Sequence, residues 1–121
     1  MTTGFQNQSL GRYGETVAAS HLQALGMVLL DRNWSCAQGE LDLLLRDGDV
    51  LVVCEVKTRK QSRHCGPLEA IDDDKLQRLR RLADLYVEAT GIRPNGIRID
   101  AVGVTHPRRG KAIVEHVAGV C

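Results

Sequence analysis

The chain has 121 residues, 43% of them hydrophobic, and a formal net charge of +1. This length suits a single domain whose core needs neither disulfides nor a structural metal. No apolar stretch approaches the roughly 20 residues of a membrane span, and the first residues lack the basic and apolar segments of an export signal. We therefore expect a soluble cytoplasmic protein, and the small net charge argues against one that coats nucleic acid by bulk electrostatics.

Four cysteines, Cys36, Cys54, Cys65 and Cys121, stand at irregular spacings without a C-x-x-C pair. Cys54 lies inside an apolar run, where a small buried thiol packs well. We interpret the four cysteines as reduced thiols. A zinc site that combines them with histidines has no spacing signature and is the weaker interpretation.

The N-terminal part of the chain predicts a helix. Residues 1–8 are mostly polar and show no periodicity, and we expect a mobile tail there. Ser9 can cap a helix that runs to about Leu25. Because Glu15 shares the helical spacing of Leu22, its carboxylate is expected to face the rest of the protein.

Three strands are expected next, at residues 27–34, 41–45 and 50–57. The last two flank an Asp47-Gly48 pair, and Asp-Gly between apolar runs is typical of a β-hairpin. A two-residue Asp47-Gly48 loop would pair residue 46 with 49 and place Asp42 opposite Val53. A four-residue loop can preserve the same pairing, whereas a loop of odd length would turn Asp42 to the other face unless a bulge corrected it.

The second half of the chain predicts a helix and two more strands. Apolar positions recur at helical spacing between Leu68 and Thr90, and residues 97–105 and 112–117 read as strands. The loop at about residues 58–67 is the candidate for a mobile or substrate-contacting segment. The predicted order is helix, three strands, helix, two strands, which indicates an α/β protein with a mixed central sheet.

Charged side chains on the two hairpin strands are candidates for chemistry. Glu55 and Lys57 share one face of their strand, and the even loop brings Asp42 to the same face. Carboxylates on adjacent strands suit a hard divalent cation such as Mg²⁺, with the Val56 carbonyl completing its shell. Lys57 could then orient a metal-activated water or neutralise charge on a phosphate. A purely structural ion pair of Lys57 with either carboxylate is the alternative.

The motif resembles a known group of enzymes. Asp42, a gap of twelve residues and Glu55-Val56-Lys57 resemble the PD-(D/E)-x-K nuclease superfamily. With Gly39-Glu40-Leu41-Asp42-Leu43, Lys57-Thr58-Arg59 and the early Gly14-Glu15, the chain resembles the YraN-type family of small uncharacterised bacterial proteins over about residues 11–104. Leu41 stands where the superfamily name has proline. The resemblance implies a restriction-endonuclease-like core, with residues 9–121 forming one nuclease-like domain.

The resemblance also implies roles for particular residues. It implies that Asp42 and Glu55 are metal ligands and that Lys57 is the catalytic lysine. Glu15 matches a helix glutamate that related junction-resolving enzymes use near the metal. Lys75 matches a helix lysine of the YraN-type pattern. Because apolar residues follow it four, seven and eleven positions later, its helical spacing predicts that it points toward the same face. An ordinary exposed lysine at a helix start is the alternative for Lys75.

The expected function is a metal-dependent nuclease that uses Mg²⁺ or Mn²⁺ and cuts DNA, in branched or processed form, with RNA also open. Basic residues beyond the catalytic strand, Arg59, Lys60 and Arg63, would position phosphates together with Lys75. A solvated surface is the alternative for each basic cluster. The alternative function is a non-catalytic nucleic-acid-binding or assembly module with a vestigial metal site, and a homodimer would suit a duplex with two strands.

Overall fold

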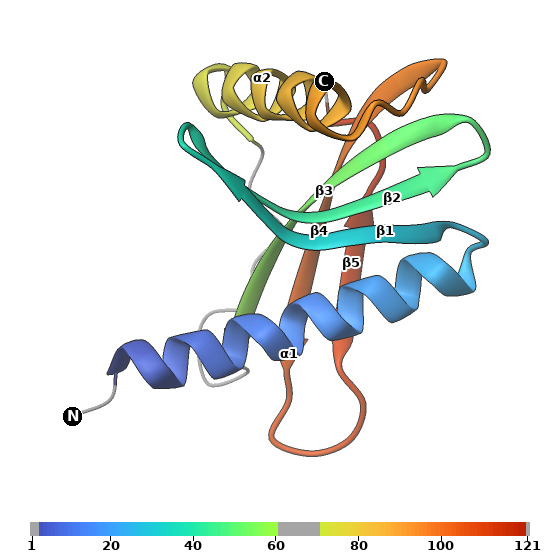
Figure 1. The fold of residues 1–121 in the computed structure, drawn as a ribbon. Coiled ribbons are helices and arrows are strands. Elements are labelled where there is room, and N and C mark those ends of the chain that lie inside the picture. Colours follow the sequence, from blue (N-terminus) through green and yellow to red (C-terminus); the bar gives the residue numbers. More distant parts are fainter. Residues whose placement is uncertain (1–2, 61–70, 121) are drawn as a thin grey trace.

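A computed structural model describes residues 3–60 and 71–120, which form two helices and one five-stranded sheet (Figure 1). The elements are α1 (Thr3–Ala24), β1 (Val28–Cys36), β2 (Gly39–Asp47), β3 (Val50–Lys60), α2 (Asp73–Thr90), β4 (Gly96–His106) and β5 (Ile113–Val117). The predicted order of elements is confirmed, and so is the α/β class with a mixed central sheet.

The sheet has the strand order β1-β2-β3-β4-β5. Neighbouring strands are antiparallel except for β3 and β4, which are parallel and are separated in the chain by α2. β3 is therefore the central strand, and its residues from Leu51 to Cys54 are all buried. The continuous apolar run of this strand reflects burial on both faces.

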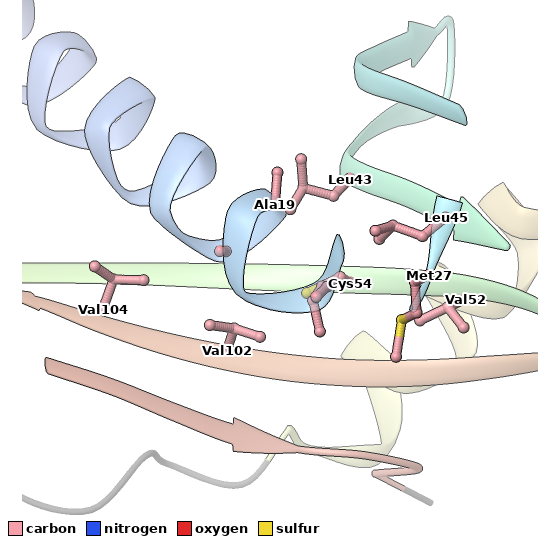
Figure 2. Close-up of a cluster of buried hydrophobic side chains, with 10 residues drawn as sticks. Ala19, Met27, Leu43, Leu45, Val52, Cys54, Val102 and Val104 are labelled. Carbon is pink, nitrogen blue, oxygen red and sulfur yellow. The ribbon is translucent and has the colours of Figure 1, made fainter. Parts of the chain in front are cut away.

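The helices lie on opposite faces of the sheet, so each face has its own core (Figure 1). Strand alternation divides β2 between them, because Leu43 and Leu45 face α1 whereas Leu44 faces α2. Figure 2 shows the core beneath α1, where Leu45, Val52 and Val102 come from three adjacent strands. Full burial of each such side chain contributes about 1.5–3 kcal/mol to the stability of the fold.

The first helix begins earlier than its sequence pattern predicts. α1 starts at Thr3, so Ser9 lies within the helix and the predicted cap at Ser9 is wrong. Before Ser9 the only large apolar residue within this helix is Phe5, so there is no apolar periodicity to detect, although glutamine is a good helix former. Neither α1 nor α2 is long and apolar enough to cross a membrane.

The second helix begins later than predicted, at Asp73 and not at Leu68. Asp72 is the N-cap, since its side chain accepts a hydrogen bond from the Lys75 backbone N–H at 2.8 Å. β3 continues to Lys60, so the start of the expected loop at residues 58–67 is strand. The remainder of that loop lies outside the described residues, as do Cys65 and Cys121, whereas Cys36 and Cys54 are free thiols.

Candidate metal centre

The candidate site lies where β2 and β3 separate. Their pairing ends at Leu43 and Cys54, although β2 continues along β1 to Gly39 and β3 continues along β4 to Lys60. Beyond this point the β1–β2 tip bends towards α2, while β3 runs towards α1 (Figure 1). We call this divergence the strand fork. Because the sheet is open there, side chains from both helices can approach the same two strands.

The hairpin register places the two candidate ligands opposite each other. Asp47 pairs with Val50, so the turn residues are Gly48 and Asp49, and the predicted pairing of residue 46 with 49 is wrong. Gly48 has a φ of 62°, and a turn with glycine at its first central position accommodates that conformation. Relative to the predicted pairing, the observed register is shifted by one residue on each strand. Continued by one residue beyond Leu43 and Cys54, the observed register places Glu55 opposite Asp42, where the prediction had Val53. Asp42 and Glu55 still lie on the same face of the sheet, as predicted, because the residue opposite Asp42 changes by two positions.

Asp42 is a half-buried carboxyl group in a negative environment. Burial and the charge of Glu55 raise its pKa to about 7, and the charge of Glu15 adds to this rise. A hydrogen bond to Asp42 Oδ2 from the Val56 backbone N–H, at 2.9 Å, opposes the rise. Asp42 also shares a hydrogen bond with the Glu55 carboxyl group. Near neutral pH Asp42 is therefore only partly ionised unless a cation lies beside it.

Glu55 is already in contact with one cation. Lys75 Nζ lies 2.6 Å from Glu55 Oε2, and the two side chains are 39% and 23% exposed. The cap at Asp72 fixes the backbone of Lys75 in the first turn of α2. The structure thus places Lys75 at the carboxylate pair, as its helical spacing predicts.

Glu15 approaches the fork from the other helix. Its side chain is 13% exposed, and its Oε1 lies 3.7 Å from Arg32 Nη2 on β1. The inward orientation expected for Glu15 is confirmed. The sequence pattern gave no reason to single out Arg32, because it stands in a polar segment that reads as an uncertain strand end.

The remaining predicted residues continue along β3. Lys57 is exposed, Arg59 is half-buried and Lys60 is exposed at the end of the strand. Alternation puts Lys57 on the same face of β3 as Glu55. Arg63 lies outside the described residues.

The oxygen donors at the fork are of the type that could hold a hard divalent cation. Within residues 3–60 and 71–120, no group of three or more His, Cys, Asp or Glu side chains could hold a metal ion by itself. Mg²⁺ is usually bound through one or two carboxylates, keeping several waters and contacting substrate phosphates. Asp42, Glu55 and the Val56 carbonyl fit that pattern.

A second buried carboxylate was not predicted from the sequence. Asp100 on β4 is completely buried, and Arg98 Nε and Nη2 donate to its two oxygens at 2.8 and 3.1 Å. His116 Nε2 lies 2.9 Å from Asp100 Oδ2, and the Gly119 backbone N–H donates to Oδ1 at 3.0 Å. Although burial raises it, these hydrogen bonds bring the pKa of Asp100 below its ordinary value. Asp100 is thus fully compensated by the protein, in contrast to Asp42.

The fold and the strand fork define a small α/β protein with a candidate cation site at the centre of a mixed sheet. The chain belongs to the family described as "Uncharacterised protein family UPF0102", which matches residues 14–104. This range contains all the candidate residues from Glu15 to Lys75. The family resemblance drawn from the sequence motifs is therefore confirmed.

Similar proteins cover nearly the whole chain. A UPF0102 protein from Nocardioides sp. is 59% identical over 113 residues, covering 93% of this chain and 91% of that protein. One from Streptomyces coelicolor is 53% identical over 114 residues, covering 93% and 88%. One from Kineococcus radiotolerans is 52% identical over 113 residues, covering 93% of each chain.

Proposed function

We propose that this protein is a cytoplasmic metal-dependent nuclease that hydrolyses phosphodiester bonds in DNA, with branched or processed DNA as the first substrate to test and RNA as the second. The observation that carries this proposal is the Asp42–Glu55 pair at the strand fork. Burial and like charge raise the pKa of Asp42 to about 7. The Val56 N–H and Lys75 compensate this unfavourable arrangement only in part. Carboxyl groups whose pKa is shifted by burial and a neighbouring charge are typical of functional sites.

Asp42, Glu55 and the Val56 carbonyl would hold Mg²⁺ or Mn²⁺. A bound divalent cation supplies a more acidic water and stabilises negative charge on the phosphate during in-line attack. Lys57, exposed on the same face of β3, would orient the attacking water or neutralise developing charge. Glu15 would help to keep the fork negative, since its charge already acts on Asp42.

Basic side chains along β3 support a nucleic-acid substrate. Arg59 and Lys60 follow Lys57 on the same strand, and Arg63 comes shortly after in the sequence. These cations would contact the phosphate backbone, which positions a substrate without reading its sequence. A homodimer would present two such sites to the two strands of a duplex.

A second candidate is a non-catalytic nucleic-acid-binding or assembly module. The contact between Lys75 and Glu55 favours it, because that contact neutralises Glu55 without a metal. The two candidates differ in what substitution of Lys57 should do. A nuclease loses cleavage while it keeps its affinity for nucleic acid, whereas a binding module shows no cleavage to lose.

The test combines metal binding with cleavage. Mg²⁺ and Mn²⁺ are titrated by calorimetry into the wild type, Asp42→Ala, Glu55→Ala and the exposed-site control Asp84→Ala. Cleavage is measured on a pool of duplex, branched and single-stranded DNA and RNA. We expect metal binding and cleavage in the wild type and Asp84→Ala and neither in the other two variants. Metal binding without cleavage of any pool member supports the binding module, and a wild type that binds no metal refutes the nuclease.

A further inference from the structure

The Lys75–Glu55 contact puts an ammonium group on an oxygen that a divalent cation would need. The distance from Lys75 Nζ to Glu55 Oε2 is 2.6 Å, so the two charged groups are in direct contact. Lysine carries a compact point charge on a flexible stem, so its ammonium can take the place of a small cation beside a carboxylate. A carboxylate oxygen directed at this ammonium is not fully available to a metal ion.

The contact is also exposed enough to open. The side chain of Lys75 is 39% exposed and that of Glu55 is 23% exposed, so water can solvate the ammonium after it leaves. Ion pairs at such positions are worth little, with a median of about 0–1 kcal/mol. A divalent ion can therefore displace the ammonium, although it must compete with it.

Helix capping keeps the displaced lysine close to the site. The Asp72 side chain accepts from the Lys75 N–H at 2.8 Å, and the Leu76 N–H donates to the Asp72 carbonyl at 2.9 Å. The backbone of this turn is thereby fixed independently of the Lys75 side chain. The first turn of α2 can release Glu55 without unfolding.

We infer that Lys75 is an internal counter-cation, which occupies Glu55 in the metal-free protein and lowers the affinity of the strand fork for divalent ions until one displaces it. This inference rests on the proposed function, since it takes Asp42 and Glu55 as the metal ligands. In this role Lys75 is a positioning residue that regulates binding of the divalent ion to Asp42 and Glu55, in addition to any contact that Lys75 makes with phosphate.

The experiment is calorimetric titration of Mn²⁺ alone, at fixed pH and about 0.15 M salt, where long-range effects of single charges are screened. The variants are Lys75→Met, which removes the charge, and Lys75→Arg, which keeps it. Arg78→Met is the matched control, because Arg78 is exposed on the same helix and loses the same charge. Thermal unfolding of each metal-free variant checks that it folds, and Lys75→Gln replaces Lys75→Met if that variant does not.

We expect Lys75→Met to lower the Kd for Mn²⁺ roughly three- to tenfold, and Arg78→Met and Lys75→Arg to change it by less than about twofold. Equal or weaker binding in Lys75→Met overturns the inference and leaves the proposed metal site intact, because it would mean that Lys75 only anchors α2. An equal gain in Arg78→Met also overturns it, since general electrostatics would then suffice. Absence of Mn²⁺ binding in all variants refutes the proposed function and this inference with it.

Discussion

Gly14 on α1 lies directly against Thr58 on β3. A Cβ atom at position 14 would overlap Thr58 Oγ1 and lie 2.9 Å from both Thr58 Cβ and Thr58 Cγ2. The helix therefore crosses the central strand at a distance that only glycine permits. Since Glu15 is the next residue, this crossing also sets how deeply its carboxylate reaches towards Asp42.

Gly14→Ala should destabilise the fold at this crossing. The added methyl group must displace the backbone of α1 or β3, and overpacking of this kind costs about 1–3 kcal/mol. Urea unfolding measures the loss. Gly11→Ala is the matched control, because a Cβ at Gly11 meets nothing within 4 Å. Alanine is the better helix former, so the control should gain up to about 1 kcal/mol. A Gly14→Ala variant as stable as the control would show that α1 and β3 are not in tight contact.

Asp42→Asn should stabilise the metal-free protein at alkaline pH. The pKa of Asp42 is raised from 3.8 to about 7, so the folded state holds this proton more tightly than the unfolded state does. The resulting stability is fully present below about pH 4 and is lost as pH rises through 7. Asparagine stays neutral and still offers an oxygen to the Val56 N–H. We expect the variant to exceed the wild type by on the order of 2 kcal/mol at pH 8.

This comparison is made by denaturant unfolding between pH 4 and 9. The difference between variant and wild type should shrink towards pH 4, where both side chains are neutral. Asp84→Asn provides the control for loss of an exposed carboxylate and should follow the wild type at every pH. A constant difference across the range would mean that Asp42 does not titrate near neutrality.

Divalent cations should reverse the alkaline loss of stability. A ligand that binds only the folded state stabilises it by about 2.7 kcal/mol at a hundredfold excess over its Kd. At pH 8 the unfolding temperature of the wild type should therefore rise with Mg²⁺ or Mn²⁺ concentration, while that of Asp42→Asn rises much less. A differential scanning measurement in each metal, with K⁺ at equal ionic strength as control, detects this. Equal responses of the two proteins would place the bound ions elsewhere.

The sequence predicted the hairpin and central strands well because local chemistry determines them. An apolar run interrupted by Asp47-Gly48 indicates a turn, and alternation then puts Asp42 and Glu55 on one face whichever even-length loop forms. The register itself was wrong by one residue on each strand. Local chemistry allows Gly48 as either the first or the second residue of a two-residue turn. Which of the two registers forms depends on the packing of Leu43, Leu44 and Leu45 against both helices.

Contacts between distant segments were the part that the sequence could not supply. The spacing of Lys75 suggested a direction but not its pairing with Glu55, which depends on where the chain places the first turn of α2. The contacts of Arg32 and of the Asp100 cluster could not be predicted from the sequence, because a single charged residue in a strand looks like a solvent-exposed position. Their partners become apparent only when the strands are assembled.

Asp100 and Asp47 offer a test of what burial adds to an ion pair, because both contact Arg98. Arg98 Nε lies 2.8 Å from Asp100 Oδ1, and Arg98 Nη1 lies 3.0 Å from Asp47 Oδ2. The Asp100 side chain is fully buried, whereas that of Asp47 is 45% exposed. Asp100→Asn leaves the guanidinium and His116 without their buried acceptor charge, which should reduce the free energy of unfolding by about 3 kcal/mol at pH 7.

Asp47→Asn removes a charge from the same arginine at the surface, so its cost should stay below about 1 kcal/mol. Urea unfolding of both variants at pH 7 gives the comparison. The pKa of Asp100 is lowered, so the stability it provides is present above its ordinary value of 3.8 and disappears as pH falls through its lower folded-state value. The gap between Asp100→Asn and the wild type should accordingly close in strong acid. Equal losses in the two variants would show that the arginine contact itself, and not the buried acceptor on β4, holds this part of the sheet together.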